Sequence, residues 1–350
     1  MTRAVVLCAT RAELPGATSS IAGLTVLSRA LKQLGQALDT RVVLASDGSL
    51  PVPPALPPNV ELLAVADRAQ AEEVGRRLGA PVVGADVVRL DRKSWDGLRV
   101  VDEPSRRAAE DAVFGALYRA DLGFVARRFN KPLSIWLTRH VLVRTAVTPN
   151  QITLFAAAVG LVGCILIATG AYAWAVAGLA CEHLQSVLDG CDGELARVRF
   201  QQSKLGAWLD TFVDDVLNVL ITVAAGTGVW HATGSRLALA CGIAGGTMLV
   251  LSNLIIMRDM RRQKASGDLM DMVWWFSGGQ KLGASTATQG KPGVGTFLFQ
   301  LGRRDAAIFL WLSFGLLHQL VLVLVMADVI ALSWFVASLV QAVVRPAPVS

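Results

Sequence analysis

Long apolar runs in the second half of the chain limit most strongly how it can fold. About 20 apolar residues cross the hydrocarbon core of a bilayer as a helix, and each of these runs approaches or exceeds that length. The last of them is long enough for two spans. The runs cover residues 151–170, 171–188, 207–229, 237–257 and 306–344. The pattern predicts an all-α domain of six transmembrane helices, with turns at 169–172, 226–235 and near 326–328.

The composition agrees with an integral membrane protein. The mean hydropathy is +0.49, and charged residues make up 17% of the chain, against roughly 25% in a soluble domain. The net charge is +6, from 33 basic and 27 acidic residues. Because the basic residues bracket the apolar runs, we assign this charge to contacts with anionic membrane lipid and not to nucleic acid.

The basic residues also predict an orientation. They cluster before the first run, between the second and third, and after the fourth, whereas the alternate turns carry only Arg236. Lysine and arginine accumulate on the cytoplasmic side of membrane proteins. We therefore expect a multi-pass protein of the cell membrane with both termini, and the polar N-terminal part, in the cytoplasm.

The first hundred residues have a different pattern. Strands are predicted at 4–8, 41–45, 60–65 and 82–90, and helices at 24–34 and 68–78, so strands and helices alternate along the chain. Alternation of this kind favours a sheet that is at least partly parallel. We expect a small α/β domain over 1–105, a connector over 106–145 and the six-span domain over 146–345.

The end of the connector is predicted to be an amphipathic helix in the membrane interface. Leu133, Trp136, Leu137 and Val141 share one side, and basic residues flank them. A helix packed against the soluble domain is the alternative.

Four aspartates interrupt the apolar background. Asp189 and Asp192 are three residues apart, and Asp210 and Asp214 four apart, so each pair shares one face of its helix. A carboxylate at the centre of a membrane helix costs about 2.5 to 3.5 kcal/mol, so four of them need compensation. The short segment between the helices lets the two faces close on each other around a divalent cation. Acids that merely face the headgroup region would explain neither the spacing nor the small residues among them.

These acids belong to a longer motif. It reads Asp189-x2-Asp192-Gly193-x2-Ala196-Arg197-x8-Gly206-x3-Asp210-x3-Asp214. At the start of the first apolar run, the chain reads Thr148-Pro149-Asn150-x2-Thr153. The motif resembles the signature of the CDP-alcohol phosphatidyltransferase family, and the second segment is similar to that family's usual start of the first span. The resemblance covers about residues 130–345, and the eight positions of the motif at fixed spacing make it specific.

The resemblance implies a reaction. A phosphoalcohol group passes from a CDP-alcohol donor to an alcohol or phosphoalcohol acceptor with release of CMP, in phospholipid or inositol-phosphate-type biosynthesis, and Mg²⁺ or Mn²⁺ neutralises the diphosphate. Asp189, Asp192 and Asp210 are implied as metal ligands. Asp214 is implied as the general base and a further metal ligand. The resemblance also implies a homodimer.

Other positions are candidate substrate contacts. Gly193, Ala196 and Gly206 lack bulk, which lets a nucleotide approach the helix backbones. Arg197 is expected to hold a phosphate or to anchor the helix at the membrane surface. The two remaining candidates, Asn150 and Thr153, are expected to reach the cytidine or to cap the first span.

Two arginines are candidates for the acceptor pocket. Arg258 ends the fourth span and Arg304 begins the fifth, on the same predicted side of the membrane. Such a pair suits an acceptor phosphate, such as inositol phosphate or glycerol phosphate. Ordinary membrane-end arginines are an equal alternative. The identity of donor and acceptor stays open.

The N-terminal domain carries a second resemblance. It is similar to the nucleotidyltransferase domain of bifunctional enzymes that make and then consume CDP-inositol. Such domains need a glycine-rich loop and a lysine, whereas residues 8–12 of this chain read CATRA. We interpret the domain as a degenerate relative.

Two other classes of protein also accommodate intramembrane acids. One is an ion-coupled transporter, and the other is a catalytically silent membrane anchor for the soluble domain. Transporters place such acids near the bilayer midplane, often in inverted repeats, and the sequence has no evident repeat. A silent anchor has no use for four acids.

Overall fold

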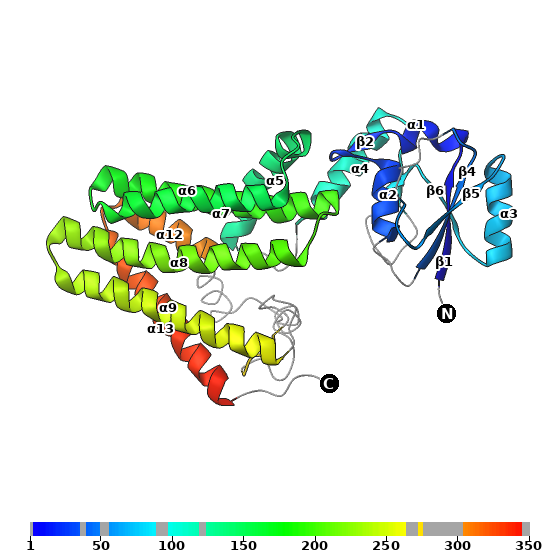
Figure 1. The fold of residues 1–350 in the computed structure, drawn as a ribbon. Coiled ribbons are helices and arrows are strands. Elements are labelled where there is room, and N and C mark those ends of the chain that lie inside the picture. The colour runs from blue at the N-terminus through cyan, green and yellow to red at the C-terminus, as the bar shows by residue number, and fades with distance from the viewer. Residues whose placement is uncertain are drawn as a thin grey trace. The chain divides into compact units, whose positions relative to one another are not determined.

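The structure, a computed structural model, describes residues 3–35, 40–49, 56–88, 97–118, 124–263, 272–275 and 304–344 (Figure 1). It divides into two compact units. The α/β unit comprises Met1–Arg119 with Thr138–Ala146 and Glu194–Gln201, and the helical unit comprises the rest.

The α/β unit is built on a parallel sheet of four strands in the order β5-β4-β1-β6. Val6 of β1 pairs with Val43 of β4 on one side and with Val82 of β6 on the other. This confirms the predicted α/β domain with a parallel sheet. The strands are β1 (Arg3–Ala9), β4 (Thr40–Ser46), β5 (Val60–Ala64) and β6 (Val82–Gly84).

Both faces of this sheet are covered by helices. Successive strand residues point to opposite faces, so β1 gives Leu7 and Ala9 to the core beside α2 (Val26–Gly35). Val6 and Cys8 go to the core beside α3 (Arg68–Leu78). Figure 1 shows the two helices on opposite sides of the sheet. A strand buried on both faces accounts for the unbroken apolar run that predicted it.

Burial also affects the thiol at the centre of β1. Cys8 is fully buried, and this burial, with a smaller contribution from the nearby carboxylate of Glu13, raises its pKa to about 11. The thiol is therefore neutral near pH 7 and acts as a small core side chain.

Two predicted elements differ in detail. The predicted helix 24–34 loses its first two residues to β3 (Leu24–Thr25), which pairs with β2 (Ser20–Ile21). The predicted strand 82–90 is interrupted after β6, and the chain continues in β7 (Val87–Val88), which pairs with β8 (Leu98–Arg99). Residues 89 and 90 lie outside the described part of the chain. Two short helices, η1 (Arg11–Glu13) and α1 (Leu14–Ala17), follow β1.

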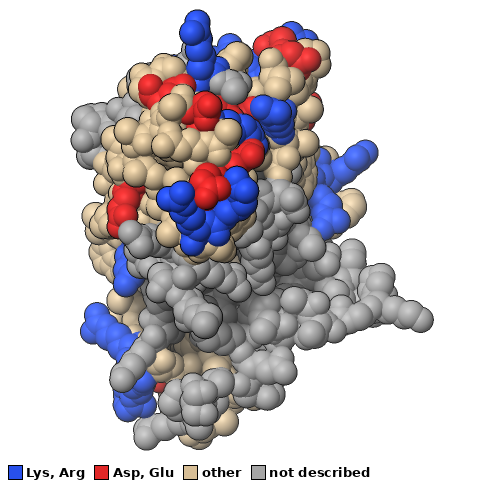
Figure 2. Space-filling view, turned by 90° about the vertical axis from the view of Figure 1, so that its right-hand side faces the viewer, with Lys and Arg blue, Asp and Glu red and all other residues tan. Residues whose placement is uncertain are grey.

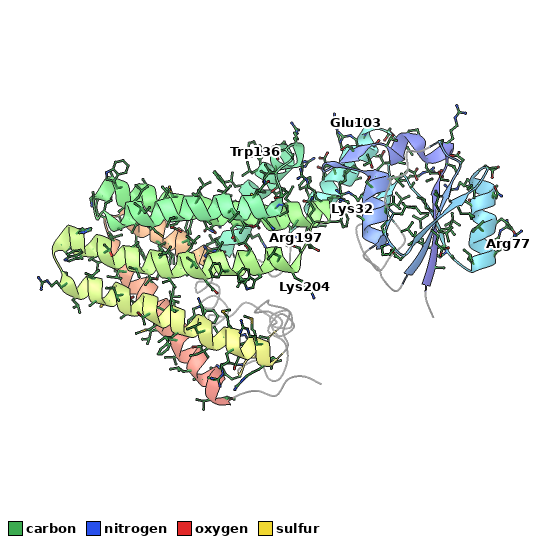
Figure 3. The ribbon with its side chains drawn as sticks, in the orientation of Figure 1. Lys32, Arg77, Glu103, Trp136, Arg197 and Lys204 are labelled. Carbon is green, nitrogen blue, oxygen red and sulfur yellow. The ribbon has the colours of Figure 1, made fainter. Side chains whose placement is uncertain are left out.

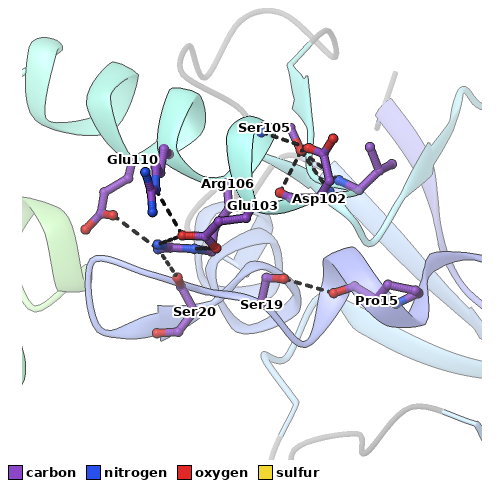
Figure 4. A network of polar contacts seen from close by, with 10 residues as sticks. Pro15, Ser19, Ser20, Asp102, Glu103, Ser105, Arg106 and Glu110 are labelled. Atoms are coloured by element: carbon purple, nitrogen blue, oxygen red, sulfur yellow. Dashed lines mark hydrogen bonds and ion pairs between the residues drawn. The ribbon is translucent and has the colours of Figure 1, made fainter.

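Helix α4 (Glu103–Gly115) is fixed at its start by polar contacts (Figure 4). Asp102 caps it by accepting a hydrogen bond from the backbone N of Ser105 at 2.9 Å. Arg106 pairs with Glu103 at 2.7 Å and also donates to the backbone carbonyl of Ser20 at 3.4 Å. These contacts join α4 to β2. Hydrogen bonds from Arg106 and then Arg107 lower the pKa of Glu103 to about 2.

Charged side chains of both signs alternate on the surface of the α/β unit (Figure 2). Along α3, Arg68 pairs with Glu72 and Arg77 with Glu73, each at 3.0 Å and four residues apart. Such exposed pairs contribute little to stability but keep the surface soluble.

The helical unit confirms the membrane domain but not its six spans. Within the described residues, four helices are long and apolar enough to cross a bilayer. They are α6 (Pro149–Ala168), α8 (Lys204–Thr233), α9 (Arg236–Arg262) and α13 (Leu320–Val344). The other two predicted spans correspond to helices α7 (Tyr172–Arg199) and α12 (Arg304–Leu316). The first carries the first part of the acidic motif, from Asp189 to Arg197, and the second has only 13 residues.

One predicted turn is wrong. The chain turns at 317–319 and not near 326–328, because α13 runs without a break through Met326 and Asp328. His318 has a left-handed backbone with φ of 61° at this turn, and its ring stacks on Tyr172 with centroids 3.4 Å apart. A single Asp inside an apolar run is thus accommodated within the helix. The predicted turn at 169–172 is found between α6 and α7.

The connector ends in η2 (Ala126–Asn130), α5 (Lys131–His140) and η3 (Leu142–Arg144). Helix α5 has an apolar side that faces outward. Leu133 and Trp136 are 50% and 55% exposed, whereas the polar Ser134 and Thr138 are buried (Figure 3). An apolar outer side with a polar inner side suits a helix at a membrane interface, as the sequence predicts.

Close backbone contact joins α6 and α7. A Cβ atom added to Gly178 would lie 2.6 Å from the carbonyl oxygen of Gly163 and 2.8 Å from Cγ1 of Ile167. Real Cβ atoms do not approach other atoms so closely, so the two helices can pack at this distance only because both positions are glycine.

We therefore predict that Gly178→Ala destabilises the protein by about 1–3 kcal/mol, since the added methyl group must push the two helices apart. The measurement is thermal unfolding in detergent, followed by tryptophan fluorescence. Gly190→Ala on the same helix is the matched control, because its Cβ would lie 3.4 Å from Oγ of Ser134, an ordinary contact. A Gly178→Ala protein as stable as the control would contradict the packing argument.

Candidate metal and substrate site

The acidic residues lie on two consecutive helices. Asp189 and Asp192 are on the second half of α7, and Asp210 and Asp214 are on the first half of α8. Arg197 and Lys204 flank the short connection between these helices (Figure 3). Its Phe200 has a left-handed backbone with φ of 56°, and its backbone N donates to the carbonyl of Arg197, which ends α7.

The two acidic faces meet, as the spacing predicts. Asp189 interacts electrostatically with the carboxylates of Asp214, Asp210 and Asp192 and with the guanidinium of Arg304. Asp192 is buried, with 6% exposure, and the other three acids are partly buried. The structure thus brings all four predicted carboxylates into one cluster.

The start of α6 completes one side of this cluster. The hydroxyl of Thr153, itself buried, donates a hydrogen bond to Asp192 and also contacts the carbonyl of Pro149 at 3.2 Å. Asn150 lies beside the start of α8, where its Oδ1 is 3.0 Å from the position of a Cβ on Gly206. Gly206 therefore allows α8 to pass close to Asn150.

These two residues do not cap the first span. Thr148 is the N-cap of α6, and it accepts from the backbone N of Gln151 while the Gln151 side chain accepts from the backbone N of Thr148 at 2.9 Å. Pro149 occupies the first helical turn. Since the cap is already made, Asn150 and Thr153 are left for the face that meets the acids.

Arg304 forms the opposite side of the cluster. It is the first residue of α12, and its guanidinium pairs with the carboxylate of Asp214 and donates from Nη2 to Oε1 of Gln185 at 3.0 Å. The next residue, Asp305, accepts from the backbone N of Ala126 at 2.9 Å, which fixes the start of α12.

Gln185 and Glu182 were missed by the sequence analysis. Both are buried on α7, and they precede Asp189 by four and seven residues, so the three share one helix face. Glu182 accepts from the thiol of Cys164 at 3.2 Å. The available signal was polar residues at helical spacing inside the run 171–188.

Three other predicted positions lie at the ends of helices or along α7. Arg197 is exposed in the last turn of α7, and Arg258 is exposed near the end of α9. Gly193 and Ala196 are partly buried between the acids and the end of α7. Of the two predicted acceptor arginines, the structure places Arg304, and not Arg258, in contact with an acid of the motif.

The donor set fits a hard divalent cation. It contains only carboxylate, hydroxyl and amide oxygens, which are the ligands preferred by Mg²⁺ and Mn²⁺. Within the described residues, no three His, Cys, Asp or Glu side chains are arranged closely enough to hold an ion as they stand. Arg304 supplies a positive charge at Asp214 within this cluster.

The family comparison agrees with the motif. The model of the CDP-alcohol phosphatidyltransferase family matches residues 146–339, which includes every acid of the cluster. The chain therefore belongs to the CDP-alcohol phosphatidyltransferase family. Its helical domain is that of a membrane transferase of phosphate-containing groups, which favours a transferase over a transporter or a silent anchor.

Curated relatives point in the same direction. A bifunctional IPC transferase and DIPP synthase of Rubrobacter xylanophilus is 34% identical over 169 residues, covering 48% of this chain and 37% of the relative. A protein of the same description from Archaeoglobus fulgidus is 33% identical over 134 residues, covering 38% of this chain and 26% of the relative. The match thus spans less than half of these relatives.

We predict that Thr153→Val lowers the affinity for Mn²⁺ by about 10–100-fold, because the substitution keeps the shape of the side chain but removes the hydrogen bond that orients Asp192. Binding of Mn²⁺ to the purified protein is the measurement. Thr227→Val is the matched control, since Oγ1 of Thr227 donates to the carbonyl of Val223 in its own helix, at 2.9 Å, and not to an acid of the cluster. Equal affinities in the two variants would rule out a role for the Thr153 hydroxyl.

Proposed function

We propose that this protein moves a phosphoalcohol group from a CDP-alcohol to the hydroxyl of an acceptor and releases CMP. The observation that carries the proposal is the cluster of four carboxylates on facing helices, inside a domain that belongs to the matching family. Mg²⁺ or Mn²⁺ bound there would supply Lewis acidity at the donor diphosphate.

The residues divide into roles. Asp189, Asp192 and Asp210 are the proposed metal ligands, with Asp214 as a further one, and Thr153 orients Asp192. Asp214 also takes the proton from the acceptor hydroxyl. The hydroxyl oxygen forms a bond to phosphorus while the bond between phosphorus and the CMP leaving group breaks. A divalent cation held by these aspartates would compensate the negative charge that develops on CMP.

The donor nucleotide is proposed to bind beside the end of α7. Gly193, Ala196 and Gly206 leave room for it along the helix backbones, and Asn150 is placed next to Gly206 for a contact with the base. Arg197, exposed in the last turn of α7, is the proposed phosphate contact on this side.

The acceptor is proposed to be a phosphorylated polyol of the inositol-phosphate type. Arg304 and Arg258 are the candidate phosphate contacts, and Arg304 lies against the proposed general base. Relatives described as IPC transferases and DIPP synthases support this class of acceptor.

The α/β domain is proposed to be a nucleotidyltransferase relative without that activity. A pocket of about 740 Å³ lies where β1, β4 and β5 end, lined by residues that include Thr10, Arg11 and Asp47. The buried carboxylate of Glu13 accepts from Thr10 and pairs with Arg68 at 2.8 Å, so it is engaged within the fold. Residues 10–15, which directly follow β1, contain no glycine that could cradle a triphosphate.

We also propose domain boundaries at 1–105, 106–145 and 146–345, a homodimer, and a position in the cell membrane with the α/β domain in the cytoplasm. The outward apolar side of α5, with Leu133 and Trp136, supports its place at the membrane interface.

The decisive test is release of CMP by the purified protein from a CDP-alcohol, with inositol phosphate as acceptor. We expect activity that depends on Mg²⁺ and that falls by about 10²-fold or more in Asp214→Asn, because the amide can neither accept the proton nor bind the metal as a carboxylate does. Asp328→Asn is the control for loss of an acid within the helical unit, since Asp328 lies against Gly245 and not in the cluster. No release of CMP from any donor would disprove the proposal.

A further inference from the structure

The contact between Arg304 and Asp214 places an arginine on the residue proposed to bind both metal and proton. The guanidinium pairs with Asp214 through Nη1 and is held from the other side by Gln185 through Nη2. Besides Asp214, the carboxylates that act most strongly on its charge are those of Asp189 and Glu182. Arg304 is thus a cation already present within the acidic cluster.

Gln185 is placed to fix this cation. Its side chain has no solvent exposure, and its amide oxygen faces Arg304 because a guanidinium can only donate hydrogen bonds. Within the described residues its Nε2 is buried without a hydrogen-bond partner. A buried donor left unpaired is unfavourable, so the orientation of the amide is dictated by the contact with Arg304.

The guanidinium and a divalent cation compete for the same carboxylate. Removal of two charges from water is costly unless they are paired, so Asp214 without another cation retains Arg304. A divalent cation at Asp214 would place its positive charge next to the guanidinium. Two cations that contact the same carboxylate repel each other strongly in a poorly solvated site. The guanidinium of Arg304 and the divalent cation therefore cannot both bind Asp214 at full strength.

On the basis of the metal site in the proposed function, we propose that Arg304 is the resident counter-cation of Asp214, that Gln185 is the positioning residue that holds it there, and that a divalent cation must displace the guanidinium from this carboxylate. Metal binding then turns Arg304 away from the proposed base and frees its hydrogen-bond donors. The acidic cluster is compensated in both states, by the guanidinium or by the metal.

The test is the affinity of the full-length protein in detergent for Mn²⁺ alone, measured from the free Mn²⁺ signal in electron paramagnetic resonance. Arg304→Gln should lower the Kd by about tenfold, because it removes a unit charge that competes for Asp214. Gln185→Leu should lower it by about threefold through a less firmly held guanidinium. The double variant Arg304→Gln/Gln185→Leu should have the same Kd as Arg304→Gln alone, since Gln185 acts only through Arg304.

Arg236→Gln is the matched control, because it removes the same charge from an exposed position at the start of α9, away from the proposed substrate contacts, and its Kd should stay within about twofold of the wild type. Arg304→Lys keeps the charge but not the two-sided contact, and should give an intermediate Kd if Arg304→Gln does not fold. A Kd that is unchanged or raised in the Arg304 variants would overturn the proposal. A Gln185→Leu effect that persists without Arg304 would overturn the role of Gln185.

The same measurement separates this inference from the proposed function. If the wild type binds Mn²⁺ and Asp189→Asn weakens the binding, the metal site stands, and only the Arg304 and Gln185 results decide the inference. If Asp189→Asn has no effect, the metal site itself is disproved, and the proposed function with it.

Discussion

The helical unit depends on compensation of the negative charge of several carboxylates in a poorly hydrated environment. Four aspartates on α7 and α8 face one another, and a cation must accompany them. This requirement explains why parts far apart in sequence meet here: the start of α6 gives Thr153 to Asp192, and the start of α12 gives Arg304 to Asp214. Close packing through glycine pairs then allows these polar groups to come into contact without separating the helices.

The two units follow different physical rules. The α/β unit has a sheet covered on both faces, and its stability comes from alternate β1 residues packed against α2 and α3. The helical unit exposes many large apolar side chains, including Leu154, Phe155 and Ile165 of α6, to 56%, 60% and 60%. Such exposure is expected only where lipid is the solvent, so the same chain is built for two environments.

The sequence predicted the elements better than the contacts between them. Spacing along one helix is a local property, so the sequence could predict that the acids of each helix share one face. The short connection between the two helices then predicted that the face of Asp189 and Asp192 meets that of Asp210 and Asp214. The partner of Asp214 could not, because Arg304 is 90 residues away and its approach depends on how α12 packs. Gln185 was missed because it lies, with Glu182, inside a run that was interpreted only by its overall apolar character, and its contact with Arg304 depends on the packing of a distant helix. The turn at His318 was misplaced because Asp328 looked like a better interruption, although a helix accommodates one acid where a small residue such as Gly245 makes room.

The length of α7 has a consequence for the lipid around it. Its 28 residues extend about 42 Å at 1.5 Å per residue, whereas the hydrocarbon core is about 30 Å thick. Counted from Tyr172, Asp189 and Asp192 lie about 26 and 30 Å along the axis, so a hydrocarbon core of this thickness that began at Tyr172 would end beside them. With α7 placed in this way, the depth of the acids would depend on hydrophobic thickness: a thicker bilayer would draw them into hydrocarbon, and a thinner one would leave them in water. For the proposed function, acyl-chain length would then determine how easily a nucleotide reaches the metal site.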